Sequence, residues 1–360
     1  MLSEQTLIIS GAGPVGLFCA LKLAQFGIST VILDPILSNE YPWVNERTIA
    51  LSYGSIQLLK QVGVDITSIQ DTDVTQVSKI QHVHISIQNK FGACDMYAND
   101  YNVDALGYVI SYSKLCHALY KACLSSHNIC FVAKKLISHN YNNKTNLVDG
   151  YVEGGAVYST PFLIVSEGSK IQQQYNESNN ANPINNNNIK DNDISLLAQQ
   201  YAHVGWVNFS NLPAKYQSTA FERFTSQGPL ALLPYKYTDN NNGNKYNYAL
   251  VWCNFNPEGN TCTIDNLYNI MGWRCGKIDN LKIEQHFNLK PQTRNLLYQN
   301  NAIYIGNSAQ SLHPVAGQGL NLGFRQAYTL VENIINNNQL SQFLTQIQKR
   351  IELGEEDEKS

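Results

Sequence analysis

Three glycines near the start of the chain have the spacing of a phosphate-binding turn. Gly11, Gly13 and Gly16 belong to the stretch GAGPVG, which follows a short apolar run at 7–9. In such a pattern the first glycine allows a tight turn, the second lets the backbone approach a pyrophosphate, and the third permits close packing of helix against strand. The next helix would offer unpaired N–H groups and a partial positive charge to the anion.

An acidic residue stands where the ribose of a bound dinucleotide would lie. Asp34 directly follows the apolar run 30–33, which reads as a second buried strand. A carboxylate there accepts hydrogen bonds from the adenosine ribose hydroxyls and disfavours the 2′-phosphate of NADP. Strand, turn, helix and second strand together predict dinucleotide binding, whereas without a ligand the pattern would be a tight strand–helix turn. These residues do not distinguish NAD from FAD.

A second glycine-rich segment lies close to the other end of the chain. It follows the apolar run 302–305 and reads GNSAQSLHPVAGQGLNLG from Gly306 to Gly323. A nicotinamide dinucleotide needs no such distant partner, whereas the ribityl chain and ring of a flavin extend well beyond the adenine half. The pair of motifs resembles the FAD-dependent aromatic hydroxylases, in which a G-D-x-x-H-x-x-x-P-x-x-G-x-G-x-N motif holds the ribityl chain and the isoalloxazine ring. FAD is therefore the predicted cofactor.

The first part of this motif suits contacts with the ribityl chain and the ring. Asn307, which follows Gly306, can hydrogen-bond a ribityl hydroxyl or the pyrophosphate. Pro314 stiffens the backbone beside the ring. We assign no catalytic role to His313, because a lone histidine is more often structural. No catalytic base is named at all, since in this class the flavin carries the chemistry.

The second part of the motif leaves space and supplies donors. Gly317 and Gly319 lack side chains that would block the ring and the substrate. Leu320 and Asn321 begin the following helix, and their N–H groups are expected to point towards the pyrimidine edge of the flavin. The helix dipole would stabilise negative charge on reduced flavin, the form that reacts with oxygen. Without a cofactor, the segment would be a glycine-rich loop before an ordinary helix.

Further segments are similar to one family within this class, the ubiquinone-biosynthesis hydroxylases. They are 45–51, 220–234, 250–253 and 272–276. The first contains Arg47, which in that family reaches over the flavin side of the cofactor. The resemblance implies an FAD-dependent monooxygenase that hydroxylates a polyprenylated phenol through a flavin C4a-hydroperoxide. It also implies O2 and either NAD(P)H or another electron donor as co-substrates.

Three positions depart from the family pattern and leave a second hypothesis open. Asn307 replaces the usual aspartate, Glu167 replaces the aspartate of a mid-chain Asp-Gly pair, and Ser111 stands where an acid is expected. Family members also continue further at the C-terminus. The alternative is a non-catalytic or impaired FAD-binding subunit of a ubiquinone-synthesis assembly. A very apolar substrate further implies contact with such an assembly or with the inner face of the membrane.

Composition argues against several other classes of protein. The chain has 360 residues and a formal net charge of -3, without the clustered lysine and arginine that nucleic acid requires. No stretch reaches the roughly 18 apolar residues of a membrane span, and the N-terminal apolar run lacks a basic flank, which predicts a cytoplasmic location. None of the eight cysteines forms a C-x-x-C pair, so we predict neither disulfides nor a metal site.

The expected fold is α/β, a Rossmann-like FAD-binding domain with an interleaved antiparallel-sheet substrate domain. Strand and helix patterns alternate near both motifs, whereas the region between them is rich in strands. We predict an FAD-binding domain from 1–80, 105–170 and 295–350, a substrate domain from 81–104 and 195–294, an asparagine-rich surface insertion at 171–194, and a polar tail at 351–360.

Two local expectations complete the sequence-based prediction. Helical spacing over 48–62 predicts a second helix after the first strand–helix–strand unit. The substrate pocket is expected between the flavin ring and the second domain, near Phe221, Phe224, Leu232 and Pro314. The same apolar residues would equally suit an ordinary core.

Overall fold

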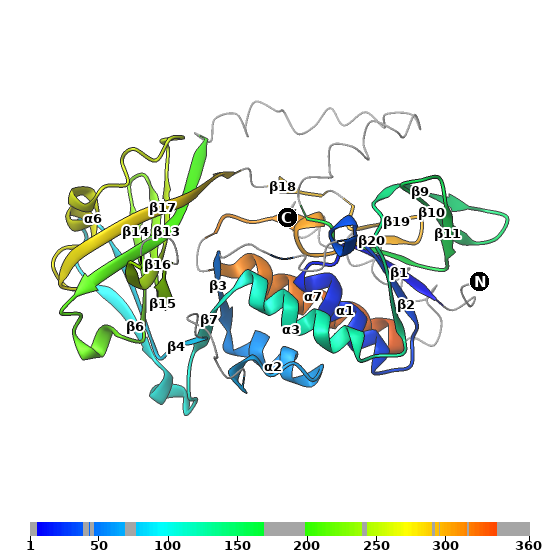
Figure 1. The fold of residues 1–360 in the computed structure, drawn as a ribbon, viewed down its shortest axis with the longest axis horizontal. Helices are drawn as coiled ribbons and strands as arrows, with labels where there is room; N and C mark the ends of the chain where they lie inside the picture. Colours follow the sequence, from blue (N-terminus) through cyan, green and yellow to red (C-terminus); the bar gives the residue numbers. More distant parts are fainter. Residues whose placement is uncertain are drawn as a thin grey trace, which may run out of the picture.

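Three groups of elements lie side by side along the molecule (Figure 1). A seven-stranded sheet lies at one end, helices and a six-stranded sheet form the middle, and a small three-stranded sheet lies at the other end. This computed structural model describes residues 6–38, 43, 47–68, 77–168, 199–239, 243–289, 292–294, 296–314 and 317–336. The predicted insertion at 171–194 and the predicted tail at 351–360 lie outside these residues.

The six-stranded sheet contains both strands that flank the first glycine motif. Its order is β19-β20-β12-β1-β2-β8, and every neighbouring pair except β19 and β20 is parallel. The strands are β1 (Leu7–Ser10), β2 (Thr30–Leu33), β8 (Ile129–Val132), β12 (Leu163–Val165), β19 (Tyr298–Gln299) and β20 (Ala302–Tyr304). Every residue of β1 and β2 is buried, as their apolar runs predict. The carboxyl ends of β1, β2 and β12 therefore meet at one edge of the sheet.

Three helices pack together beside this sheet, with a fourth against the last of them. They are α1 (Pro14–Ala24), α3 (Tyr112–Leu124) and α7 (Gln318–Asn336), and the fourth is α2 (Tyr53–Gln61). The rings of Phe18 and Phe324 lie 5.2 Å apart in the core between α1 and α7. A Cβ atom on Gly323 would lie 2.7 Å from Val15 Cγ2, so this glycine permits the close crossing of the two helices. Both ends of the described chain thus share one core.

A three-stranded antiparallel sheet lies between the helices and the seven-stranded sheet (Figure 1). Its strands are β3 (Thr48–Ser52), β7 (Gly107–Ser111) and β4 (Ser78–Ile80), in the order β3-β7-β4. The helix predicted over 48–62 is therefore wrong in its first five residues, because α2 begins only at Tyr53. Strand β3 starts with two β-branched residues and pairs along its whole length with β7, and this pairing overrides the local helical spacing.

The seven-stranded sheet has the order β17-β13-β16-β15-β14-β5-β6 and is antiparallel except where β14 pairs with β5. Its strands are β5 (His82–Ile87), β6 (Ala93–Tyr97), β13 (Gln200–Ser210), β14 (Thr219–Thr225), β15 (Gly228–Thr238), β16 (Lys245–Asn254) and β17 (Lys277–Leu289). Helix α6 (Ile264–Met271) covers one face. The other face packs against the β3-β7-β4 sheet, where Trp206 and Ala220 share a core with Val109.

The remaining elements are short. They are β9 (Leu136–Asn142), β10 (Leu147–Val152), β11 (Val157–Thr160), β18 (Gln292–Thr293), β21 (Gln310–Ser311), and the 3₁₀ helices η1 (Pro35–Ser38), η2 (Ile66–Ser68), η3 (Ala98–Tyr101), η5 (Ala214–Tyr216) and η6 (Gly306–Ser308). The predicted α/β fold is confirmed, while the domain boundaries stay a prediction. No helix among the described residues is long and apolar enough to cross a membrane.

Candidate functional site

The glycines of the first motif have different reasons for lacking a side chain. A Cβ on Gly11, at φ +108°, would lie 2.7 Å from the Ser166 carbonyl carbon, and one on Gly16 would lie 2.1 Å from the Gly11 oxygen. Both glycines are required by the protein's own backbone. The nearest atom to a Cβ on Gly13 is the Tyr112 hydroxyl at 3.6 Å, an ordinary contact. The protein leaves that side of Gly13 open, which suits a group lying against the turn.

Helix α1 begins at this turn without a side-chain cap. Its N-cap is Gly13, whose position offers no side-chain hydrogen bond, and its first turn contains no acidic residue. The first N–H groups of a helix have no partners within the helix, and the dipole concentrates positive charge there. An uncapped N-terminus beside an open glycine suits a pyrophosphate.

Asp34 is oriented by the same turn. At the end of β2, its Oδ2 accepts a hydrogen bond of 2.8 Å from the Ala12 N–H, and its Oδ1 accepts one of 2.9 Å from the Ile36 N–H. The carboxylate is therefore held in one orientation before any ligand arrives. Each oxygen keeps a further lone pair, which is compatible with the predicted contact to a ribose hydroxyl.

Glu167 carries an oxygen atom without a hydrogen-bond partner close to Asp34. The Ser10 hydroxyl donates to its Oε1, while its Oε2 is buried and has no hydrogen-bond partner. Burial and, to a smaller extent, the charge of Asp34 raise the pKa of this carboxyl to about 8, while Lys135 opposes the shift. At neutral pH the side chain is mainly protonated and can donate a hydrogen bond. An unsatisfied buried polar atom of this kind fits contact with a polar ligand.

The second glycine motif folds directly against the first. A Cβ on Gly306 would lie 3.4 Å from Val15 Cγ2, so η6 rests on the start of α1. The Gly168 N–H donates to Ser308 Oγ at 3.2 Å and joins the end of β12 to η6. Asn307 is exposed beside this junction, where a ligand can reach it. The two motifs therefore form one continuous surface.

The start of α7 is fixed by the side chain of Asn321. Its Oδ1 accepts hydrogen bonds from the Ser52 N–H at 2.9 Å and the Ser55 hydroxyl at 2.7 Å. Its Nδ2 donates to the carbonyls of Ala50 at 3.0 Å and Gly317 at 2.8 Å. This positioning role of the side chain is absent from the sequence-based prediction, because it depends on contacts with β3 and α2. The expected role of the backbone N–H stays a prediction.

The other residues of the second motif leave an opening at this helix end. A Cβ on Gly319 would have no heavy atom within 4 Å, and one on Gly317, at φ +61°, would make only an ordinary contact with Ala50 at 3.5 Å. Pro314 and Leu320, which flank these two glycines in the sequence, are half-buried. Residues 315 and 316 lie outside the described part of the chain. This space suits a flat ring placed over the start of α7.

Arg47 reaches the site through an aromatic residue that the sequence analysis did not name. Its guanidinium lies 4.3 Å from the centre of the Tyr112 ring, and its carbonyl accepts a 2.8 Å hydrogen bond from the Tyr112 N–H. The Tyr112 hydroxyl in turn lies beside Gly13. Burial raises the pKa of Tyr112, so its hydroxyl stays protonated and can donate a hydrogen bond. Ser111, where an acid was expected, instead caps α3.

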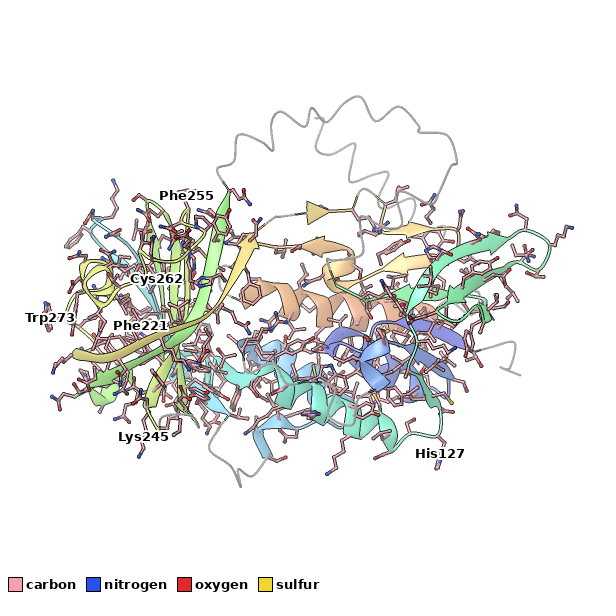
Figure 2. All side chains as sticks on the ribbon, turned by 45° about the horizontal axis from the view of Figure 1, so that its top comes forward. His127, Phe221, Lys245, Phe255, Cys262 and Trp273 are labelled. Carbon is pink, nitrogen blue, oxygen red and sulfur yellow. The ribbon has the colours of Figure 1, made fainter. Side chains whose placement is uncertain are left out.

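The predicted substrate pocket is only partly compatible with the geometry. Phe221 and Leu232 are buried in the core beneath α6, and for them the core alternative holds (Figure 2 labels Phe221). Alternation along β14 places Phe224 on the opposite face of the sheet from Phe221, the face that contains Ala220 and packs against β7. His313 joins the second motif to β13 through a 2.9 Å contact between its Nε2 and Gln200 Oε1. Burial lowers the pKa of His313, which keeps the ring neutral.

The geometry fits one extended dinucleotide. An acid for the ribose, an uncapped helix with an open glycine for the pyrophosphate, and an opening at a second helix N-terminus follow one another across the paired motifs. A nicotinamide dinucleotide would use only the first part of this surface. The fold and the site together fit an FAD-binding protein of the aromatic-hydroxylase class.

Comparison with known proteins points the same way. Residues 4–106 match the FAD binding domain family. The chain is 22% identical over 356 residues to ubiquinone hydroxylase UbiM of Neisseria meningitidis, covering 95% of this chain and 71% of the relative. It is 25% identical over 362 residues to 3-demethoxyubiquinol 3-hydroxylase of Escherichia coli, covering 93% and 81%. The fold is similar to PqsL, a probable FAD-dependent monooxygenase from Pseudomonas aeruginosa, at a TM-score of 0.65 and 13% identity over 96% of this chain and 91% of that one.

These matches confirm three of the sequence-based predictions. The cofactor is FAD, the class is that of the FAD-dependent aromatic monooxygenases, and the chain is related to the ubiquinone-biosynthesis hydroxylases. The individual contacts that each site residue makes with FAD stay predictions.

Proposed function

We propose that this chain is an FAD-dependent monooxygenase that hydroxylates the ring of a polyprenylated phenol in ubiquinone biosynthesis. The observation that carries the proposal is the packing of η6 on the start of α1, which joins two distant glycine turns into one surface. The names of the relatives support the substrate class. Within this substrate class we favour a 2-octaprenyl-6-methoxyphenol, because of the resemblance of segments 220–234, 250–253 and 272–276 to hydroxylases of such phenols.

Each part of the site would hold one part of the cofactor. Asp34 would bind the adenosine ribose, the N-terminus of α1 at Gly13 the pyrophosphate, and Asn307 the ribityl chain. The N–H groups at Leu320 and Asn321 would face the pyrimidine edge. When bound, FAD supplies the transfer of an oxygen atom from O2 to an electron-rich ring.

The protein's own contribution is binding, orientation and exclusion of water. Asn321 holds the start of α7 in place, so the positive end of its dipole has a fixed position relative to the ring. Protonated Glu167 would donate a hydrogen bond to the bound cofactor. The electron donor in this proposal is NAD(P)H or another reductant. The apolar tail of the substrate favours peripheral contact with the inner face of a membrane or with other ubiquinone-synthesis enzymes.

Activity with purified protein tests this function. Protein reconstituted with FAD is expected to be yellow and to consume NAD(P)H and O2 together only when a prenylated phenol is present. A hydroxylated product, identified by mass spectrometry, completes the evidence. The same phenol without its ring hydroxyl serves as the control substrate. Protein that stays colourless after incubation with FAD would exclude the proposal.

The second candidate is a non-catalytic FAD-binding subunit of the same synthesis. It is favoured by Glu167, whose longer side chain is kept mainly protonated where the family has an aspartate. Complementation of a hydroxylase-deficient strain separates the two functions. Restored ubiquinone synthesis supports the enzyme, whereas soluble, FAD-loaded protein that fails to complement supports the subunit.

A further inference from the structure

Three possible metal ligands converge at one edge of the seven-stranded sheet. His82 and His84 alternate along β5 and so share a face, and the register with β6 places Asp95 opposite His84. His82 Nε2 and His84 Nδ1 each lie 2.7 Å from Asp95 Oδ1. The three ligand atoms lie within 4.8 Å of one another. Val83, between the histidines, packs towards β7, so this cluster is on the face directed away from the flavin motifs.

The ligand types match a borderline divalent cation. Two imidazoles and one carboxylate are a common donor set for zinc, which takes four ligands in a tetrahedron and accepts water as the fourth. The side chains of His82 and His84 are 12% and 16% exposed, while that of Asp95 is 36% exposed. The histidines are therefore largely shielded, and the carboxylate leaves an entry path from solvent.

The surroundings of His82 already have the orientation that metal binding requires. The Thr219 hydroxyl donates to the Lys215 carbonyl at 2.8 Å, so its oxygen can only accept at His82 Nδ1, 3.0 Å away. That contact fixes a proton on Nδ1 and directs Nε2 towards Asp95. The Tyr97 ring stacks on the imidazole at 4.3 Å and restricts its rotation. A metal-bound histidine characteristically donates its second N–H in this way.

The second ring nitrogen of His84 is bound by the guanidinium of Arg274. Arg274 Nη1 lies 2.9 Å from His84 Nε2, and because a guanidinium only donates, His84 must carry its proton on Nδ1 and give it to Asp95. Metal binding at Nδ1 would move that proton to Nε2 and displace Arg274. Burial and, to a smaller extent, the charge of Arg274 lower the pKa of nearby Arg223, so the two cations disfavour each other. Arg274 is exposed, so its side chain can turn into solvent when a cation displaces it.

We propose that His82, His84 and Asp95 form a binding site for a divalent transition-metal cation of the zinc type, with Arg274 as the group that the cation displaces. The sequence predicts no metal site from its cysteine spacing, whereas the ligands here are two histidines and an aspartate that strand pairing brings together. The site is separate from the FAD surface and links the edge strands β5 and β6. It holds whether or not the chain hydroxylates a phenol.

Zinc titration against a chromogenic chelator tests the site in the full chain. Wild-type protein is expected to bind one equivalent of zinc, and binding should raise its melting temperature. Removing a ligand, in His82→Ala or His84→Ala, should weaken binding more than about 100-fold, beyond the 10- to 100-fold effect of a second-shell change. Arg274→Gln should instead tighten binding, a gain that a purely structural network would not produce.

Three control variants show whether zinc binds at other histidines or cysteines. His127→Ala removes an exposed histidine at a distant helix end (labelled in Figure 2), and His286→Ala removes one from another histidine pair. Cys94→Ala removes an exposed thiol next to Asp95 in sequence but on the other face of β6. All three should bind zinc like the wild type. Loss of binding in any of them, unchanged binding in His84→Ala, or no stoichiometric zinc in the wild type would overturn the proposal. Melting temperatures measured without zinc identify any variant that fails to fold, and Asp95→Asn then replaces it.

Discussion

Glu167 combines a buried position, an unsatisfied oxygen and a second acid nearby. Glu167 follows strand β12, and its carboxyl group lies near the charge of Asp34. The family pattern has a shorter aspartate at this position. In water a glutamate ionises near 4.5, and here burial raises its pKa to about 8. The folded chain therefore holds a proton that the unfolded chain releases between these two values. The free energy of unfolding should fall as the pH rises through this window.

The protonation of Glu167 should also make FAD binding depend on pH, and replacing Glu167 with glutamine should remove that dependence. The neutral amide keeps a hydrogen-bond donor at high pH, whereas in the wild type a second carboxylate forms beside Asp34 and repels the pyrophosphate. We expect the wild-type Kd for FAD to rise about tenfold from pH 7 to pH 9, and that of Glu167→Gln to stay nearly constant. Titration by flavin fluorescence measures both. A wild-type Kd that is flat over this range would contradict the assignment.

At the scale of elements, the turn from β1 to α1 separates a steric role from a binding role. Gly16 is crowded by backbone, whereas Gly13 has an extended conformation (φ −72°, ψ 174°) that alanine adopts easily. Gly13→Ala should therefore keep the melting temperature of the FAD-free protein and weaken FAD binding at least about tenfold. Gly16→Ala should destabilise the fold itself by about 3 kcal/mol. Thermal unfolding without FAD, followed by flavin titration, distinguishes them. Equal effects of the two variants on stability would refute this reading.

The junction of α7 with β3 and α2 depends on one buried amide. Asn321→Ala would leave several backbone and hydroxyl groups without partners, at a cost of roughly 2–3 kcal/mol in the free energy of unfolding. Arg325→Ala, at an exposed position of the same helix, should change stability by less than about 0.5 kcal/mol. Urea denaturation measures the difference. Similar midpoints for the two variants would show that the junction is not held by Asn321.

Across the whole molecule, burial decides which cysteine thiols can react. All eight are free; six are buried, and burial raises the pKa of each of those six. Only Cys94 and Cys130 are exposed. Because the thiolate is the reactive form, we expect two rapidly reacting thiols in the native protein and eight in denaturant. Ellman's reagent counts them. More than two fast thiols would mean that the core opens readily.

Sequence patterns predict the parts of this fold that depend on local chemistry. Local sequence alone is sufficient to predict the glycine turn, the buried strands β1 and β2, and the position of Asp34 at the end of β2. The strand β3, the Arg47–Tyr112 contact, the protonated state of Glu167 and the pairing of His84 with Asp95 do not. Each of these depends on which distant segment lies alongside, and that is decided by tertiary packing.

The packing of α7 on α1 also governs how the molecule is made. During translation, helix α1 emerges from the ribosome long before α7. Until α7 has been made, the apolar side of α1 that packs against Phe324 has no partner. A nascent chain can therefore begin its nucleotide fold early, but it gains α7 and the second glycine motif only after translation of residue 336. Truncated translation products should be both colourless and dependent on chaperones.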